Sequence, residues 1–299
     1  MGMKIVLALG GNALLAKGQK GTAQEQRENI AKTCESIARI VNNGHEVVIT
    51  HGNGPQVGNL LIQQERSKEE VAAMPMDVCD AMTQGQLGYL IQSELEKVSH
   101  RSVATLITQI VVDKDDLGFK HPSKPVGPFY EEKASEDMVL DAGRGWRRVV
   151  PSPIPLDVVE INAIKSLLKA GIIVIAAGGG GIPVFRNGEK LAGIAAVIDK
   201  DRASALIGEE IKADILVIAT SIDKVYINFG KENQEALDRV NVADAKKLID
   251  EGHFAEGSMK PKVESCVDFV EKGGQKAIIC ALGDIEAAIE GKAGTIIEV

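Results

Sequence analysis

The chain has 299 residues, of which 44% are hydrophobic and 25% charged, and its formal net charge is −8. This composition suits a globular protein with one large α/β domain, or with two lobes around a continuous core. The negative charge and the aromatic content of 3% argue against nucleic acid as the main partner. No apolar run is long enough to span a bilayer, and no secretory signal is recognisable at the N-terminus, so we expect a cytoplasmic protein with no membrane partner.

The cysteines and histidines show no pattern of a metal site. The four cysteines are scattered without CxxC spacing, and the five histidines include no HExxH pair. Free cysteine in an apolar periodic segment behaves as a small buried hydrophobe. We therefore predict free thiols in a reducing compartment and no metal bound by the protein's own side chains.

The first third of the chain alternates apolar runs with amphipathic segments, which predicts βαβ units. A strand at 4–9 is followed by a helix that opens with the capping-box spacing of Thr22 and Glu25. A second strand, 46–51, leads into a helix at 55–66. A long helix is expected at 77–98 and a strand at 102–113. The apolar residues that we expect to face inward from the long helix are Val78, Met82, Leu87, Ile91, Leu95 and Val98.

Residues 113–155 break this alternation. Six prolines lie among scattered charges and the single tryptophan, so the segment cannot form one regular element. Short strand-like runs occur at 129–130 and 147–150. We interpret the segment as a small protruding flap over the site, because structureless loops of this length are uncommon in compact domains.

The second half resumes the α/β pattern. We predict helices at 156–170, 201–211, 242–251, 261–272 and 284–290, strands at 172–177, 214–218, 225–228, 277–280 and 295–299, and a hairpin at 182–193 turning at Asn187-Gly188. The predicted fold class is a three-layer α/β/α sandwich with a mostly parallel central sheet and the small flap as a subdomain.

Three of the predicted strands end in clustered glycines. These turns lie at Gly10-Gly11, at Gly52-Asn53-Gly54 and at 178–181. If the strands are parallel, the turns share one edge of the sheet, where open α/β folds bind ligands. Bare main-chain amides there favour a phosphate or carboxylate. A Walker A motif is missing, and Gly58 lies one residue too far for a GxGxxG motif.

Two lysines occupy unusual positions. Lys262 falls in the first turn of a helix, where a cation opposes the helix dipole unless an anion is bound nearby. Lys200 follows an apolar run and stands between two aspartates, of which Asp201 could orient both ammonium groups. Solvated surface lysines are the simpler interpretation of any single lysine. A pair beside glycine turns would instead stabilise a phosphoryl group during transfer.

Other polar residues have a simpler explanation. We expect His51 to support its turn by hydrogen bonding, Arg147 and Arg148 to form a solvated pair, and the acidic run 113–116 to be solvated and metal-free.

At these positions the chain resembles the carbamate kinases, a family of the amino-acid-kinase superfamily. The resemblance runs from end to end, with the motifs in family order. The matching motifs are Leu9–Leu14, His51–Gly58, Lys124–Pro128, Ile198–Asp201, Val225–Gly230 and Gly257–Lys262. In place of a lysine that many superfamily members carry before the first glycine turn, this chain has Ala8, and Lys200 is the expected replacement.

The resemblance implies reversible phosphoryl transfer between carbamoyl phosphate and ADP, giving carbamate and ATP with Mg²⁺, at the end of arginine breakdown. It also implies a homodimer of chains with two lobes. Residues 1–155, including the flap at about 113–155, would bind carbamate, and 156–299 would bind nucleotide. Rival hypotheses are a kinase for another small acid, the same reaction run toward carbamoyl phosphate synthesis, and a catalytically silent nucleotide or anion sensor.

The resemblance also assigns roles to residues. Main-chain amides of Gly10, Gly11, Gly52 and Asn53 would hold carbamate and the phosphoryl group. Asn12 would support the first turn, and Lys124 would reach in from the flap. Lys200 and Lys262 would stabilise the transferring charge, with Asp201 orienting them. Asp223, Tyr226 and Met259 would border the nucleotide. Lys260 is a second candidate cation beside Lys262.

Overall fold

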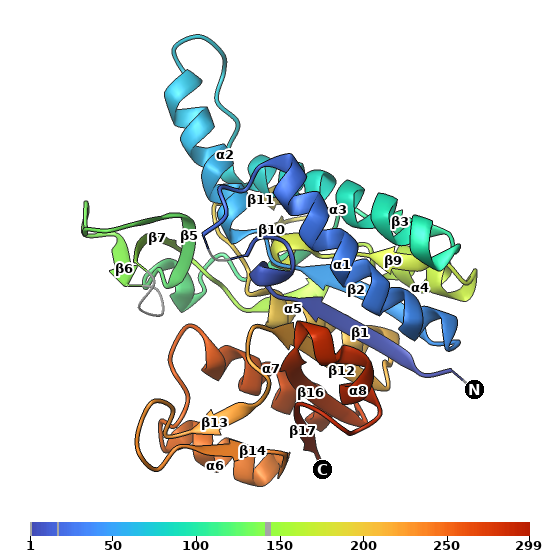
Figure 1. Cartoon of the computed structure of the whole chain (residues 1–299). Coiled ribbons are helices and arrows are strands. Elements are labelled where there is room, and N and C mark those ends of the chain that lie inside the picture. The colour runs from blue at the N-terminus through green and yellow to red at the C-terminus, as the bar shows by residue number, and fades with distance from the viewer. Residues whose placement is uncertain (1, 17, 141–144) are drawn as a thin grey trace.

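The computed structural model describes residues 2–16, 18–140 and 145–299, with only the main chain of Asn12. Within these residues, eight strands form one central sheet, and all neighbouring pairs from β16 to β3 are parallel. From one edge to the other the strands are β15 (Arg239–Asn241), β17 (Thr295–Glu298), β16 (Lys276–Ala281), β12 (Ile215–Thr220), β1 (Lys4–Leu9), β2 (Glu46–His51), β9 (Ile173–Ile175) and β3 (Val103–Thr105). The mostly parallel sheet is therefore confirmed (Figure 1).

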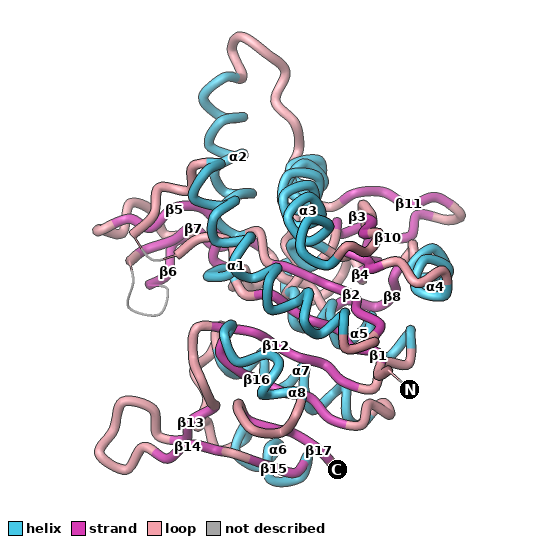
Figure 2. The backbone as a smooth tube through the Cα atoms, turned by 45° about the vertical axis from the view of Figure 1, so that its right-hand side comes forward, coloured by secondary structure: helices cyan, strands magenta, loops and turns pink. Residues whose placement is uncertain are grey.

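Helices cover both faces of this sheet, which confirms the three layers (Figure 2). Ile5, Leu7 and Leu9 of β1 join one apolar cluster, whereas Val6 and Ala8 join the other. Strands buried on both faces are apolar throughout for this reason. The first face is covered by α1 (Ala23–Asn42), α3 (Met76–Ser99) and α8 (Ile285–Ile289), and the second by α4 (Ile161–Lys169), α5 (Lys200–Ile211), α6 (Val242–Asp250) and α7 (Met259–Glu271).

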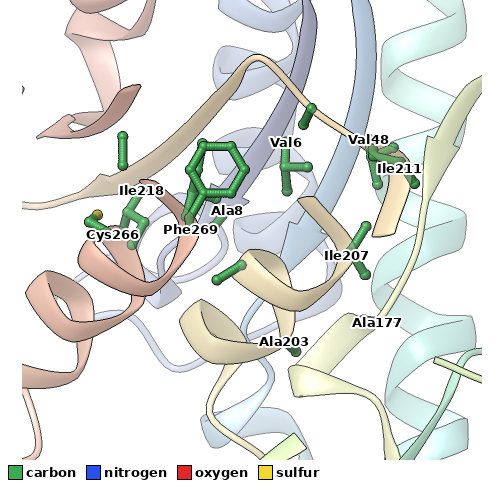
Figure 3. Close-up of a cluster of buried hydrophobic side chains, with 14 of the residues drawn as sticks. Val6, Ala8, Val48, Ala177, Ala203, Ile207, Ile211, Ile218, Cys266 and Phe269 are labelled. Atoms are coloured by element: carbon green, nitrogen blue, oxygen red, sulfur yellow. The ribbon is translucent and has the colours of Figure 1, made fainter. Parts of the chain in front are cut away.

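The second face packs tightly around one aromatic ring. Figure 3 shows Phe269 reaching from α7 toward Val6 and Ala8 of β1. Phe269 is 1% exposed. Gly208 of α5 lies so close that a Cβ there would be 2.7 Å from Cε2 of Phe269. Glycine at this position lets α5 approach α7.

Most predicted elements form where the sequence pattern places them, and α1 has the predicted capping box between Thr22 and Glu25. The inward face of α3 differs from the prediction. Met82 and Val98 are exposed, and the helix buries Asp80, Thr83 and Gln84 instead. The reason is that this face meets the side chain of Asn53 and the main-chain carbonyls of Thr108 and Gly178 rather than the apolar sheet.

The predicted strand at 102–113 divides into β3 and β4 (Gln109–Val112), which belong to different sheets. Gln84 causes the break, because its side chain binds both the N–H and the C=O of Thr108, at 2.7 and 3.1 Å. The helix predicted from 156 begins only at Ile161, after β8 (Pro155–Val158) has paired with β4. Hairpin strands β10 (Ile182–Asn187) and β11 (Lys190–Gly193) complete this four-stranded sheet, as the turn residues predict.

The flap is an ordered antiparallel sheet of β5 (Lys124–Tyr130), β6 (Met138–Leu140) and β7 (Trp146–Val150), at the left of Figure 1. Residues 141–144, within the predicted flap, lie outside the described part. The flap rests on α2 (Gly54–Ser67), where Gly58 meets Gly127 so closely that a Cβ on Gly58 would be 1.9 Å from the Gly127 Cα.

One prediction about the flap is wrong. Arg147 is 7% exposed rather than solvated. Its Nε donates to the Gly127 carbonyl at 2.9 Å, and its guanidinium lies 4.9 Å from the centre of the Phe129 ring. Arg148, by contrast, is exposed and pairs with Asp137 at 2.8 Å. Arg147 thus packs within the flap, and its Nη2 also approaches α2, where a Cβ on Gly54 would lie 3.3 Å from it.

Residue 156, the predicted boundary between lobes, does not coincide with a break in the sheet. Strand β9 lies between β2 and β3, so the segment after residue 156 first packs with the amino-terminal half. The assignment of each ligand to one lobe stays a prediction. A two-stranded sheet of β13 (Val225–Ile227) and β14 (Glu235–Leu237) lies beside the last strand of the chain, β17, because Thr295 Oγ1 accepts the Val225 N–H and donates to the Leu237 carbonyl.

All four cysteines are free thiols, as predicted, and all four are buried. None of the described helices has both the length and the apolar character needed to span a membrane.

Candidate active site

The first two glycine turns lie side by side because β1 and β2 are adjacent and parallel, with Leu9 opposite His51. The sheet itself uses two of the predicted amides: Gly10 N–H donates to Ala219 O at 2.9 Å, and Gly52 N–H to Leu9 O at 3.1 Å. Within the described residues, the N–H groups of Gly11 and Asn53 have no such acceptor. Of the four predicted amides, these two are therefore available to an anion.

Lys200 and Lys262 meet on one carboxylate. Asp201 accepts a hydrogen bond from Lys200 on Oδ1 and from Lys262 Nζ on Oδ2, the latter at 2.7 Å. The Asp201 side chain is only 3% exposed. The pair lies beside the glycine turns, because a Cβ on Gly52 would be 3.6 Å from Cδ of Lys200. Helices α5 and α7 thus deliver two cations to the amides of the first half.

A third cation arrives from the flap. Lys124, at the start of β5, pairs with Oδ2 of Asp199. Asp199 is also the N-cap of α5, since its Oδ1 accepts the N–H groups of Asp201 and Arg202 at 2.8 and 3.3 Å. One carboxylate therefore starts the helix that carries Lys200 and anchors the flap lysine. This role of Asp199 was not predicted, although aspartate before an apolar-periodic segment is a known N-cap signal.

The buried charges do not cancel. Three lysines and the buried carboxylates of Asp199 and Asp201 leave one positive charge in the site. Burial would raise the pKa of Asp201, but Lys200 and Lys262 outweigh it and hold that pKa below its usual value. Burial lowers the pKa of Lys200 despite the attraction of Asp201. A bound anion would complete the charge balance.

His51 supports the second turn, as expected. Its Nδ1 lies 3.1 Å from the carbonyl oxygen of Gly52, and the residue is 1% exposed. Burial lowers the pKa of His51 to about 4, so the ring is neutral at pH 7. The ring packs against Gly178, where a Cβ would come within 2.6 Å of it. The imidazole is thus part of the wall of the site.

The four-glycine loop fits around Asn53. Gly179 has a φ of 70°, and a Cβ there would lie 2.2 Å from the Asn53 Nδ2. That nitrogen donates to Oγ1 of Thr83 at 2.8 Å and to Oδ1 of Asp80 at 3.2 Å. Neither Asp80 nor Thr83 was predicted from the sequence as a site residue. Their spacing with Gln84 on one helical face was the available signal.

The structure separates Lys262 from Lys260, which pairs with Glu256 at 2.8 Å rather than with Asp201. Of the predicted nucleotide residues, Tyr226 donates to Asp223 at 2.9 Å, and Met259 packs against the larger apolar cluster at the start of α7. Asn12 lies in the short 3-10 turn Gly11–Ala13, and its side chain is outside the described part.

Among the described side chains, no group of three or more histidine, cysteine, aspartate or glutamate residues could hold a metal ion. Asp113 and Asp115 of the acidic run are exposed.

The free main-chain amides of Gly11 and Asn53, beside a lysine pair on a shared carboxylate, form an arrangement suited to phosphoryl transfer. The family model described as "Amino acid kinase family" matches residues 3–281. A curated carbamate kinase of Thermococcus kodakarensis is 49% identical, over 98% of each chain. The solved carbamate kinase of Giardia lamblia bound to citric acid has a TM-score of 0.94 at 38% identity, covering 99% of this chain and 98% of that one. The same enzyme bound to AMP-PNP gives a TM-score of 0.92 at 39% identity, with the same coverage.

The chain therefore belongs to the amino acid kinase family and, within it, to the carbamate kinases. It is a kinase.

Proposed function

We propose that the chain transfers a phosphoryl group between carbamoyl phosphate and ADP, forming carbamate and ATP. The observation that carries the proposal is the carboxylate of Asp201 held between Lys200 and Lys262. This geometry keeps two like charges together in a buried site, which is useful only if a more highly charged anion binds there. Lys124 adds a third positive group from the flap.

In the direction of ATP synthesis, an oxygen of the ADP β-phosphate forms a bond to phosphorus, and the bond from phosphorus to the carbamate oxygen breaks. The three equatorial oxygens of the moving group carry the charge. Lys200 and Lys262 would stabilise these oxygens, and the amides of Gly11 and Asn53 would hold the carbamate end. The leaving carbamate and the attacking phosphate are both anions, so no general base is needed, which agrees with a neutral His51.

Mg²⁺ would enter with the nucleotide. Asp199 and Asp201 are the acidic side chains described here as joining the site, and lysines already pair with both. This donor set fits an ion held mainly by phosphate oxygens and water, as is usual for Mg²⁺ in kinases. When bound, the ion neutralises charge on the phosphates of the nucleotide.

The nucleotide would lie on the carboxyl-terminal side of the site, bordered by Asp223, Tyr226 and Met259. Support comes from the solved carbamate kinase of Giardia lamblia, which has been described with AMP-PNP bound. We further propose a homodimer, for which analytical ultracentrifugation is the test, and a place at the end of arginine breakdown in the cytoplasm.

A coupled assay of ATP formation from carbamoyl phosphate, ADP and Mg²⁺ tests the proposal. Lys262→Ala should lower kcat about 100-fold or more, with little change in the KM for ADP, because the lost contact acts on the moving group. Lys260→Ala is the matched control, since this neighbour pairs with Glu256 and should leave kcat within about twofold. Equal losses in the two variants would remove Lys262 from its role.

The rival hypotheses have their own outcomes. Turnover of acetyl phosphate in preference to carbamoyl phosphate would indicate a kinase for another small acid. No turnover of any acyl phosphate would favour a sensor. The direction of the reaction in the cell is independent of the site, because an enzyme lowers the barrier both ways.

A further inference from the structure

Asn53 presents its side chain in one defined orientation. The residue is 2% exposed and caps α2, directly after Gly52. Its carboxamide nitrogen donates to two acceptors of α3, Thr83 Oγ1 and Asp80 Oδ1. The carboxamide occupies the space left by the missing side chain of Gly179, so it lies between the second and third glycine turns.

The hydroxyl of Thr83 decides which end of the carboxamide faces α3. A hydroxyl has one hydrogen to donate. Thr83 donates that hydrogen to the main-chain oxygen of Asp80 at 2.7 Å. Toward Asn53, at 2.8 Å, it can only accept, so the atom facing it must be the nitrogen. The carboxamide oxygen therefore faces away from α3, and within the described residues it accepts no hydrogen bond.

Asp80 reinforces this orientation at a high energetic cost. It is 2% exposed, and its Oδ2 has no hydrogen-bond partner among the described atoms. Burial raises the pKa of Asp80 to about 8, with a further contribution from Asp77, so the carboxyl group is mostly neutral at pH 7. A buried acid that makes a single side-chain contact, to Asn53, needs a reason beyond packing.

We propose that Asp80 and Thr83 are positioning residues that aim the carboxamide oxygen of Asn53 at the amino group of carbamate, and so select carbamoyl phosphate over acyl phosphates that lack an N–H. The inference rests on the proposed function. An amino group offers two N–H donors where acetyl phosphate offers a methyl group. A methyl group would leave the carboxamide oxygen of Asn53 without a hydrogen-bond donor. That loss disfavours acetyl phosphate far more strongly than a difference in size alone could.

The test compares kcat/KM for carbamoyl phosphate and acetyl phosphate, with ADP and Mg²⁺, in the full chain. Thr83→Val and Asp80→Leu each remove an acceptor and free the carboxamide to turn. The ratio of the two kcat/KM values should fall about tenfold or more. Thr83→Ser and Asp80→Asn keep an acceptor oxygen and should retain the ratio within about threefold. A ratio does not depend on the folded fraction, so partial unfolding does not obscure the result.

Ser99→Ala is the matched control, because it removes another buried hydroxyl of α3 at the far end of the helix. Its ratio should equal that of the unaltered chain. If Thr83→Val and Asp80→Leu slow both substrates equally, the two residues are structural and the inference is wrong, whereas the proposed function stands. No turnover of carbamoyl phosphate by the unaltered chain would overturn the proposed function and the inference with it.

Discussion

Asp201 neutralises one of two ammonium groups that would otherwise repel each other in a buried site. Asp201→Asn keeps the size of the side chain and removes its charge. Loss of one partner from a buried ion pair costs about 3–5 kcal/mol. We expect the free energy of unfolding to fall by about that amount, and kcat by more than about 100-fold because the lysines lose their common anchor. Denaturant titration and the coupled assay measure both, with the exposed Asp250→Asn as control. A stable, active Asp201→Asn would contradict the charge argument.

His51 predicts how stability depends on pH. Its pKa is about 4 in the folded chain against 6.5 in the unfolded one, so the unfolded state binds more protons between these values. The contribution of the neutral His51 to the free energy of unfolding is therefore fully present above pH 6.5 and is lost as the pH falls toward 4. Between pH 8 and pH 5 the loss due to this group is about 2 kcal/mol. Unfolding at both pH values, in the unaltered chain and in His51→Gln, measures it. The variant should lose less on acidification, and equal losses would assign the effect to other groups.

Two glycines within helices allow packing and helix propensity to be compared by the same substitution. A Cβ added to Gly208 of α5 would lie 2.7 Å from Cε2 of Phe269. A Cβ added to Gly85 of α3 would have no neighbouring atom within 4 Å. Gly208→Ala should lower the free energy of unfolding by about 1–3 kcal/mol through overpacking. Gly85→Ala should raise it by up to about 1 kcal/mol, because alanine is the better helix former. Chemical denaturation measures the free energy of unfolding of both variants. A gain of stability in Gly208→Ala as well as in Gly85→Ala would show that helix propensity outweighs packing.

Some helices and strands could be predicted from the local sequence, and others could not. Strand β1 and helix α1 follow from apolar runs and a capping box, which are local signals. The polar face of α3 does not, because Asp80 and Thr83 are buried by a contact with Asn53, about 30 residues earlier in the chain. The end of β3 likewise depends on Gln84 binding Thr108. Periodicity reports which residues are apolar, and it cannot report which polar residues find partners in the fold.

Across the whole molecule, the catalytic elements come from three distant parts of the chain. The glycine turns and the lysines were predictable as candidates because each breaks a local rule: clustered glycine after a strand, or a cation at the start of a helix. Their meeting at Asp201 follows from the neighbouring positions of β2, β1 and β12 in the sheet. The contact of Lys124 with Asp199, 75 residues away, follows only from the position of the flap on α2.

Substitution of Gly58 tests whether the position of Lys124 depends on the contact between the flap and α2. Alanine there would place its Cβ 1.9 Å from the Gly127 Cα, so helix and flap would have to separate. Lys124 lies on the same strand, three residues before Gly127, and would move with it. We expect Gly58→Ala to lower kcat/KM about tenfold or more, although alanine favours the helix itself.

The double variant makes the argument quantitative. If Gly58→Ala acts by displacing Lys124, then Gly58→Ala combined with Lys124→Ala should lose little more activity than Lys124→Ala alone, because residues that act through one contact are not additive. Coupled assays of the two single variants and the double variant give the coupling free energy. Fully additive losses would show that Gly58 supports the site by another route, with Asn53 at the start of the same helix as the nearest candidate.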